Sequence, residues 1–286
     1  MPVTKSTPKT ILITGATDGI GRLTANLLAS KGHRVLIHGR NFEKLQSTNK
    51  EVGHQTKAYL ADLSNLNDVD NLANIIAEEH DRLDVLINNA GVLSTSTSRS
   101  KSRIGIDLRF VVNTISPFLL TTKLIPLMNS RSRVINVSSA AQQAVNIKAL
   151  HGAVEIDDDM SAYAQSKLAL IQWTNGLSKL IGNQSPLMIS VNPGSLLGTK
   201  MVKNHFHIEG KPVRIGAEVL YKLSTSNEFD GYSGVYYDND LGGFGTPHPN
   251  ALDDKSNQEI INSVQRILRN KANLSLSAYP PEQARS

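Results

Sequence analysis

The chain has 286 residues, 40% hydrophobic and 19% charged, and its 30 basic and 25 acidic side chains give a formal net charge of +5. This composition is typical of a globular protein with a substantial core, in one large α/β domain or two small ones. Because the basic residues are scattered rather than striped, nucleic-acid binding is not expected, and the lack of cysteine excludes disulfides and thiolate metal sites.

The start of the chain carries no targeting signal that we can identify. Residues Met1 to Lys9 lack the apolar core of a signal peptide. We see no run of about 18 apolar residues, so a membrane span is not expected. A cytoplasmic enzyme is therefore the default expectation.

From residue 10 onward, strand-like and helix-like patterns alternate. Strands are expected near residues 10–14, 34–38, 57–61, 84–88, 133–138, 188–192 and 234–237. Helices are expected near residues 20–31, 42–51, 66–80, 106–128, 161–181, 214–225 and 254–269. Such alternation predicts an α/β fold, a single doubly wound Rossmann-type domain with a seven-stranded parallel sheet and helices on both faces. We place the domain at 10–275, between a flexible N-terminus (1–9) and a flexible C-terminal tail (276–286).

A glycine-rich turn joins the first strand to the first helix. Strand, glycine turn and helix form the geometry in which free backbone N–H groups hold a pyrophosphate. The spacing is G-x-x-x-G-x-G, so the general dinucleotide fingerprint is met only approximately, and a turn without a ligand is the plain alternative. The candidate cofactor residues here are Gly15, Thr17, Asp18, Gly19, Ile20 and Gly21.

The second strand ends in Gly39-Arg40-Asn41, without the acid that usually binds the ribose 2′-hydroxyl of NAD. A guanidinium in its place favours a 2′-phosphate, so NADP is expected rather than NAD. An ordinary surface arginine is the alternative. Asp18 counts mildly against additional phosphate charge nearby.

Two further strand ends carry candidate cofactor residues. Asp62, followed by Leu63, ends the third strand, where its carboxylate could meet an adenine amino group. Asn89, Ala90 and Gly91 end the fourth, where a purely structural turn stitched by asparagine side chains is the alternative.

Four motifs in this order resemble the short-chain dehydrogenase/reductase family: T-G-x-x-x-G-I-G at 14–21, N-N-A-G at 88–91, Ser139, and Y-x-x-x-K at 163–167. The resemblance covers about residues 10–240 and is similar to the retinol-dehydrogenase-like and protochlorophyllide-reductase-like branches. It implies a Rossmann-type fold and nicotinamide-dependent redox chemistry on a small carbonyl or alcohol substrate. Homodimers or homotetramers that pair the long central helices are common in this family.

Tyr163 and Lys167 lie four residues apart in a helical pattern and share a face. A tyrosine with the ordinary pKa near 10 is a poor base at neutral pH. We expect the ammonium of Lys167 and the positive nicotinamide to lower the pKa of Tyr163, which then acts as general acid or base. Both residues are also candidate cofactor contacts, and an exposed surface pair is the alternative.

The resemblance assigns Ser139 to orient the substrate oxygen, with Ser138 as the alternative because strand alternation points the two serines in opposite directions. It assigns Asn113 to a water relay that reaches Lys167. Pro117 has no N–H, so we expect the carbonyl of Asn113 to be free of its helical partner. A simple proline kink is the alternative.

After the sixth strand, Pro193 and Gly194 resemble the loop that the family places over the nicotinamide. The family's usual threonine position holds Gly198, and Thr199 comes one residue later. Either the loop bulges by one residue, which makes Thr199 the candidate contact, or another group contacts the nicotinamide carboxamide. Residues 195–212 are expected to form a substrate lid. Its Met201, Val202, Phe206 and Ile208 are candidates for an apolar pocket or for ordinary core. His205 and His207 lack metal-ligand spacing, so no metal is expected.

The function that we expect is an NADP-dependent oxidoreductase that transfers hydride between nicotinamide and a carbonyl/alcohol pair. A non-catalytic NADP-binding regulatory protein is the first alternative, although Tyr163 and Lys167 are both retained. A dinucleotide-dependent epimerase or dehydratase is the second, and it would need a larger substrate domain than the residues beyond 192 provide.

Overall fold

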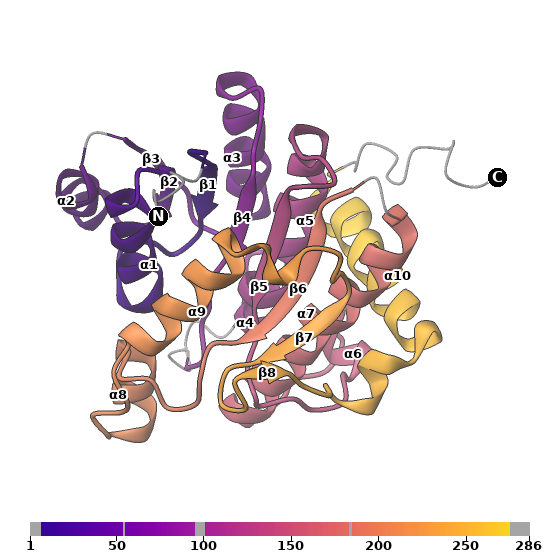
Figure 1. Ribbon diagram of the computed structural model, residues 1–286. Coiled ribbons are helices and arrows are strands. Elements are labelled where there is room, and N and C mark those ends of the chain that lie inside the picture. Colours follow the sequence, from indigo (N-terminus) through magenta and orange to yellow (C-terminus); the bar gives the residue numbers. More distant parts are fainter. Residues whose placement is uncertain (1–6, 54, 95–100, 183–184, 275–286) are drawn as a thin grey trace.

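The computed structural model describes residues 7–53, 55–94, 101–182 and 185–274. Within these residues an eight-stranded sheet lies between two helical layers (Figure 1). Its strands follow the order β3 (Thr56–Leu60), β2 (Arg34–Gly39), β1 (Thr10–Ile13), β4 (Val85–Asn88), β5 (Arg133–Val137), β6 (Leu187–Asn192), β7 (Val235–Asp238) and β8 (Gly243–Phe244). All neighbours pair in parallel except β8, which is antiparallel to β7. The predicted doubly wound fold is confirmed, with one short strand beyond the seven predicted.

Two apolar clusters hold the helices on the sheet. One face carries α1 (Gly19–Ser30), α2 (Phe42–Val52) and α9 (Arg214–Thr225). The opposite face carries α3 (Leu66–Glu79), α5 (Ser116–Leu124), α7 (Asp159–Ile181) and α10 (Asp254–Ala272). The central strands are buried on both sides, which explains why they read as continuous apolar runs.

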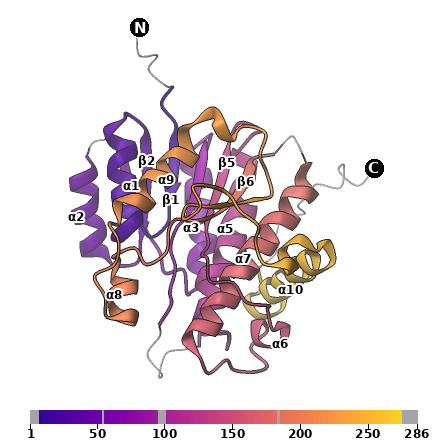
Figure 2. The same cartoon turned by 60° about the horizontal axis from the view of Figure 1, so that its bottom comes forward.

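Shorter elements depart from the predicted helices. The single helix expected at 106–128 is divided into α4 (Leu108–Phe110), the π-helical turn η2 (Val111–Ile115), α5 and the 3₁₀ turn η3 (Ile125–Leu127). Four short elements were not predicted from the sequence: α6 (Ile147–Leu150), α8 (Lys200–Phe206) and the 3₁₀ turns η5 (Asn227–Phe229) and η6 (Pro249–Leu252). Both views place α8 at the end of the molecule, beyond α9 (Figures 1 and 2). The predicted tail at 276–286 and residues 1–6 of the predicted N-terminus lie outside the described residues.

One helical stretch, Leu108–Leu127, is long and apolar enough to cross a membrane by length and composition alone. Its most apolar window has a mean hydropathy of 1.4, and 83% of that window is buried inside the protein. Its apolar side chains therefore pack in the core, where they contact α3 and α7. The absence of a membrane span and the cytoplasmic location remain predictions.

The long central helices have little free surface. Every residue of α5 except Lys123 is buried, and α10 packs along α7 in both views (Figures 1 and 2). The amide of Asn175 donates to the carbonyl of Ala251, and an added Cβ on Gly176 would lie 2.7 Å from the Cδ1 of Ile261. The predicted homodimer or homotetramer remains a prediction. Pairing through α7 would have to displace α10.

The strand order reverses at β1, which lies between β2 and β4, so the carboxyl ends of these strands surround a switch point. Asn89 ties two of the ends together, because its side-chain nitrogen donates to the carbonyls of Thr14 (2.9 Å) and Gly15 (3.1 Å). The hydroxyl of Thr14 accepts the backbone N–H groups of Asn89 and Ala90. An added Cβ on Gly21 would lie 2.4 Å from the carbonyl oxygen of Gly15, so only glycine permits this contact.

A buried histidine extends this connection to β2 and β3. The Nδ1 of His38 accepts the N–H of Gly15 at 3.2 Å, and its Nε2 lies 3.0 Å from the carbonyl oxygen of Ala61. These partners require the neutral ring with its proton on Nε2. Burial lowers the pKa of His38 to about 4, in agreement with this assignment. His38 thus holds three strand ends in register, a role that no motif predicted.

The depressed pKa of His38 predicts acid sensitivity. The unfolded chain has the ordinary value of 6.5, so it binds this proton more readily than the folded protein. The stability contribution of neutral His38 is complete above about pH 6.5 and is lost as pH falls towards 4, by up to about 3 kcal/mol. Urea unfolding between pH 4 and 7 measures this loss.

The variant His38→Asn keeps a hydrogen-bond acceptor but cannot titrate, so its stability should depend less on pH than that of the wild type. His151→Asn, which changes a partly exposed histidine, serves as the matched control and should keep most of the wild-type slope. An unchanged slope in His38→Asn would show that His38 does not titrate in this range.

Candidate active site

A cavity of about 610 Å³ runs along the carboxyl ends of the strands. This volume lies within the range of small-molecule and cofactor sites. Among the predicted site residues, Asn113 and Gly21 lie behind its wall. The others line it: Gly15, Thr17, Asp18, Gly19, Ile20, Arg40, Asp62, Leu63, Asn89, Ala90, Gly91, Ser139, Tyr163, Lys167, Pro193, Gly194 and Thr199.

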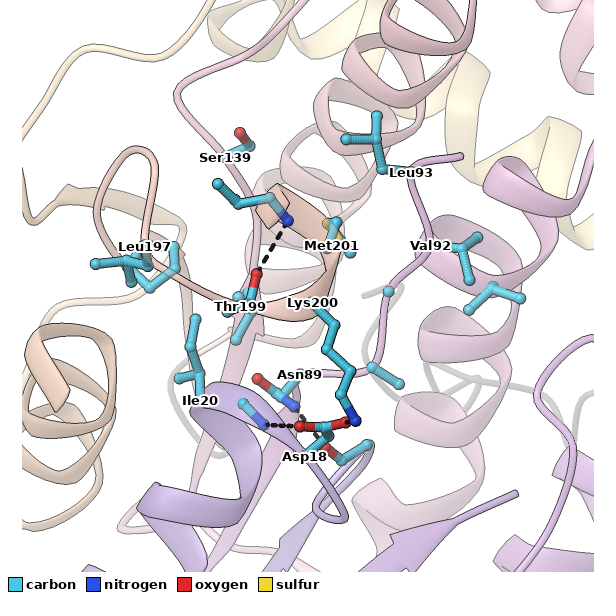
Figure 3. Close-up of a pocket in the computed structure, with 18 of the residues that line it drawn as sticks. Asp18, Ile20, Asn89, Val92, Leu93, Ser139, Leu197, Thr199, Lys200 and Met201 are labelled. Carbon is cyan, nitrogen blue, oxygen red and sulfur yellow. Dashed lines mark hydrogen bonds and ion pairs between the residues drawn. The ribbon is translucent and has the colours of Figure 1, made fainter. Parts of the chain in front are cut away.

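The glycine turn forms one end of this cavity, where α1 begins. Asp18 is the N-cap of α1, and its carboxylate accepts the N–H of Gly19 at 2.9 Å. Lys200 reaches across from α8 and pairs with Asp18 at 2.7 Å (Figure 3). Although burial acts in the opposite direction, the hydrogen bonds from Lys200 and Gly19 lower the pKa of Asp18. The negative charge of Asp18 is therefore balanced within the protein.

Two cations and an acid line the cavity beside the glycine turn. Arg40 is exposed directly after β2, and Lys44 from the first turn of α2 lines the same wall. Asn41 caps α2 by accepting the N–H of Lys44 at 2.9 Å. Asp62 follows β3 and accepts the N–H of Ser64 at 2.9 Å. Lys44 was not predicted as a site residue, because a lysine early in a helix is common.

The opposite end of the cavity holds Ser139, Tyr163 and Lys167. Ser139 lies close enough to Tyr163 to act on the pKa of the tyrosine through its side chain. The Nζ of Lys167 donates to the carbonyl of Val137 at 2.7 Å and lies 5.6 Å from the centre of the Tyr163 ring. The predicted shared face of Tyr163 and Lys167 is therefore present, and it is turned inward.

The charge states at this end differ from the sequence-based expectation. Burial raises the pKa of Tyr163, although the side chain of Ser139 acts in the opposite direction. Burial also lowers the pKa of Lys167 to about 7. The expectation of a lowered tyrosine pKa is wrong for the protein without cofactor. Removal from water disfavours the charged form of both groups.

Ser138 and Ser139 point to different partners, as strand alternation required. The hydroxyl of Ser138 is buried and donates to the carbonyl of Lys167 at 3.1 Å. The hydroxyl of Ser139 accepts the N–H of Ala141 and contacts Tyr163. Because Ser138 is occupied with the helix backbone, the geometry favours Ser139 as the serine that meets a substrate.

Asn113 is fully buried in η2, where the N–H of Ser116 bonds to the carbonyl of Val111 five residues earlier. The helix is therefore widened by a π-helical turn before Pro117, which differs from a simple proline kink. The side chain of Asn113 bonds to both backbone groups of Val92 and donates to the hydroxyl of Ser166. A water relay from its carbonyl remains a prediction.

The loop after β6 is fixed by a carboxylate that the motifs did not indicate. Asp240 accepts hydrogen bonds from the backbone and hydroxyl of Ser195 and from the side chain of Asn192. Although burial acts against it, these bonds and the charge of Lys211 lower the pKa of Asp240 to about 2. Asp240 therefore remains a carboxylate and anchors the loop at Pro193–Gly194.

Thr199 is the N-cap of α8, and its hydroxyl accepts the N–H of Val202 at 3.4 Å. An added Cβ on Gly198 would lie 2.3 Å from the carbonyl oxygen of Glu209, so this close approach requires glycine. In Figure 3, Thr199 lies between Ile20 and Ser139 in the picture plane, along the wall of the cavity. Its contact with a cofactor remains a prediction.

Apolar side chains that include Leu93, Leu197 and Met201 line the half of the cavity that holds Ser139 (Figure 3). Figure 3 shows Ser139 and Leu93 at the end opposite Asp18. Ile208, a predicted pocket residue, is 41% exposed and is not part of the lining. The apolar side chains of this region are Val92, Leu93, Val112, Met160, Leu197, Met201, Val202 and Phe206.

His205, in α8, and His207, at the end of that helix, do not share a partner. The Nδ1 of His205 lies 2.7 Å from the hydroxyl of Ser94, and His207 ends the helix in a left-handed conformation. Across residues 7–274, leaving out the undescribed gaps, no three His, Cys, Asp or Glu side chains gather as metal ligands.

A family model described as short chain dehydrogenase matches residues 9–209. Retinol dehydrogenase 13 of Homo sapiens is 30% identical over 253 residues, which cover 80% of this chain and 76% of that protein. A Pseudomonas aeruginosa structure described as the RhlG/NADP active-site complex matches with a TM-score of 0.66 and 25% identity, covering 83% of this chain and 97% of that one.

A structure of an uncharacterized protein from Mycobacterium paratuberculosis matches with a TM-score of 0.76 and covers 94% of this chain and 95% of that one. At 22% identity, this likeness shows the fold alone. The family model spans the glycine turn, Ser139, Tyr163 and Lys167, which are the residues on which the resemblance was based. The chain therefore belongs to the short chain dehydrogenase family, as an oxidoreductase that uses a nicotinamide dinucleotide.

Proposed function

We propose that this protein is an NADP-dependent oxidoreductase that interconverts a carbonyl compound and an alcohol, with Tyr163 as general acid and base. One observation carries the proposal: a continuous cavity joins the glycine turn and Arg40 to Ser139, Tyr163 and Lys167. When bound there, the nicotinamide supplies or accepts the hydride.

The residues along the cavity fit a dinucleotide from end to end. The N-terminus of α1, a 12-residue helix, and the glycine turn offer backbone N–H groups to a pyrophosphate. Asp62 and Leu63 would hold the adenine side. Asn89, Ala90 and Gly91 line the middle of the cavity, and Pro193 and Gly194 would bound the nicotinamide end.

The charges beside the glycine turn favour NADP over NAD. Arg40 and Lys44 line the wall where a 2′-phosphate would lie, and β2 ends without an acid. From the sequence alone, the negative charge of Asp18 was expected to disfavour an additional phosphate nearby. In the structure its carboxylate is paired with Lys200, which balances that charge. The similar RhlG structure, described as an NADP complex, supports the same choice.

The acid–base chemistry follows from burial. Tyr163 keeps its proton at neutral pH because burial raises its pKa, and a protonated phenol can donate to the oxygen of a carbonyl during reduction. Alcohol oxidation needs the phenolate, which the ammonium form of Lys167 would stabilise. The hydroxyl of Ser139, which lies beside Tyr163, would hold the substrate oxygen between the two side chains.

The apolar wall around Ser139 suggests a substrate with an apolar body. Leu93, Met160 and Phe206 contribute to this wall, and together they favour burial of hydrocarbon over charged groups. The similarity to retinol dehydrogenase 13, named for an apolar alcohol, is consistent with this class.

Residues 195–212 form the proposed lid of the single domain at 10–275. Its two ends are joined, because the N–H of Gly198 donates to the carbonyl of Lys211 and the N–H of Lys211 donates to that of Leu196. Between these ends, Met201, Val202 and Phe206 of α8 line the cavity. The Lys200–Asp18 ion pair connects α8 to the glycine turn. Neither a regulatory binding role nor an epimerase is favoured by any of these contacts.

Replacement of Tyr163 by Phe should remove the proton donor while the dinucleotide still binds. We expect kcat for NADPH consumption, measured against a panel of aldehydes, ketones and quinones, to fall by about 10²–10⁴-fold. The affinity for NADPH, followed by its fluorescence, should change little. Tyr232→Phe changes an exposed tyrosine and is the matched control.

The contrary result is full activity in the Tyr163→Phe variant. A wild-type protein that binds NADPH but consumes it with no member of the panel would instead point to the regulatory alternative.

Loss of the Arg40 guanidinium should reduce use of NADP selectively. Since a hydrogen bond to a charged group is worth about 1.5–3 kcal/mol, kcat/KM for NADPH should fall by about 10- to 100-fold in Arg40→Ala. The value for NADH should stay nearly constant. Arg34→Ala, at the opposite end of β2, should change neither value. Equal losses with both cofactors would argue against recognition of a 2′-phosphate by Arg40.

A further inference from the structure

An ion cluster around a buried arginine joins the segment that carries Asn113 to the helix that carries Tyr163, and its Asp159 side chain is 34% exposed. Arg109 lies in α4 with only 2% of its surface exposed. Its Nε and Nη2 donate to the two carboxylate oxygens of Asp107 at 2.8 and 2.6 Å. Its Nη1 donates to Asp159, the first residue of α7. One guanidinium thus binds two carboxylates from separate segments.

The spacing of these residues relates the cluster to the active site. Arg109 precedes Asn113 by four residues, and Asp159 precedes Tyr163 by four residues, so each ionic group lies about one helical turn from a proposed active-site residue. Neither Arg109 nor Asp159 lines the cavity. Any effect of the pair on turnover must therefore act through the position of the two helical segments.

A second tether lies among the active-site residues, at Ser166, which is between Tyr163 and Lys167 on α7. The side chain of Asn113 donates to the hydroxyl of Ser166, and the hydroxyl of Thr114 donates to the carbonyl of Ser166, at 2.9 and 2.8 Å. Tyr163 therefore lies between Asp159 and Ser166 on α7, while Asn113 lies between Arg109 and Thr114. Two tethers fix the two segments against sliding along each other.

The segment near Asn113 has particular need of such a tether. It passes through the π-helical turn η2, whose wide hydrogen-bond pattern departs from that of a regular helix. α4 is the first turn of the continuous helical stretch Leu108–Leu127 and leads directly into this π-helical turn. The bidentate bond to Asp107, the N-cap of α4, fixes the guanidinium before it meets Asp159.

We propose that Arg109 and Asp159 are positioning residues that set the register between Asn113 and the Tyr163–Lys167 pair. This rests on the proposed function, in which that pair performs the acid–base step. Because a displacement of about 1 Å at the reacting groups can cost about 100-fold in rate, loosening this register should reduce turnover without touching the dinucleotide site.

The test uses Asp159→Asn, which preserves side-chain shape and leaves Arg109 paired with Asp107. We expect kcat for NADPH consumption to fall by about 10- to 100-fold, while KM and the dissociation constant for NADPH change by less than about twofold. Hydrogen exchange should become faster in the first two turns of α7. Arg109→Lys keeps the charge but loses the planar fork, so its kcat should lie between those of Asp159→Asn and the wild type.

The matched control is Asp230→Asn. Asp230 likewise pairs with a buried arginine, Arg133, but at the opposite ends of the strands. It should leave kcat and the exchange of α7 unchanged. An unchanged kcat and unchanged exchange in Asp159→Asn would overturn the proposal, and so would equal losses in Asp159→Asn and Asp230→Asn.

If the wild-type protein consumes no NADPH with any substrate in the panel, the proposed function fails while the tether can still be judged by exchange. Faster exchange confined to the start of α7 supports the tether in that case. Unchanged exchange contradicts it.

Discussion

The proposed active site depends on a lysine that is kept away from water. Lys167 is 3% exposed, and its Nζ donates to the carbonyl that ends β5. An added Cβ on Gly91 would lie 3.4 Å from this Nζ and 3.3 Å from the Oδ1 of Asn113, so both groups lie directly beside Gly91. Burial lowers the pKa of Lys167 to about 7, so near neutral pH its charge responds to small changes in its surroundings. Tyr163 beside it lines the cavity, and removal from water raises its pKa, so that it remains protonated at neutral pH.

The surrounding fold keeps this arrangement in place through the strand ends. Thr14, His38 and Asn89 connect β1 to β2, β3 and β4 through hydrogen bonds to backbone groups. The glycine turn and the acid–base pair lie at opposite ends of one cavity because β1 and β5 are separated only by β4 in the sheet. The proposed lid, residues 195–212, is held by Ser195, which donates to Asp240, and by Lys200, which pairs with Asp18.

Much of this architecture could be predicted from the sequence, because the buried strands are continuous apolar runs and the long helices are periodic. The exceptions have physical causes. α8 buries none of its residues and β8 has two residues, so neither leaves a clear hydrophobic pattern. The π-helical turn at Asn113 lies inside an apolar stretch whose periodicity resembles that of an ordinary helix.

The site was predictable where a motif specifies it and not elsewhere. The family pattern indicated Tyr163, Lys167 and Ser139, which the structure brings to one end of the cavity. His38, Arg109 and Asp240 act through partners distant in sequence, and no local spacing distinguishes them from ordinary polar residues. In the protein without dinucleotide the pKa of Tyr163 is raised and not lowered, because burial is a property of the fold and cannot be taken from a spacing of four residues.

The most direct measurement is the titration of Lys167 itself, by NMR of lysine labelled with ¹³C at Cε. The variant Lys167→Met assigns its signal by the peak that disappears. A buried amine at the centre of the site should titrate near pH 7 in the protein without dinucleotide. If the signal instead titrates near pH 10.5, with the ordinary lysines, the amine is exposed to water and the account of the acid–base pair is contradicted.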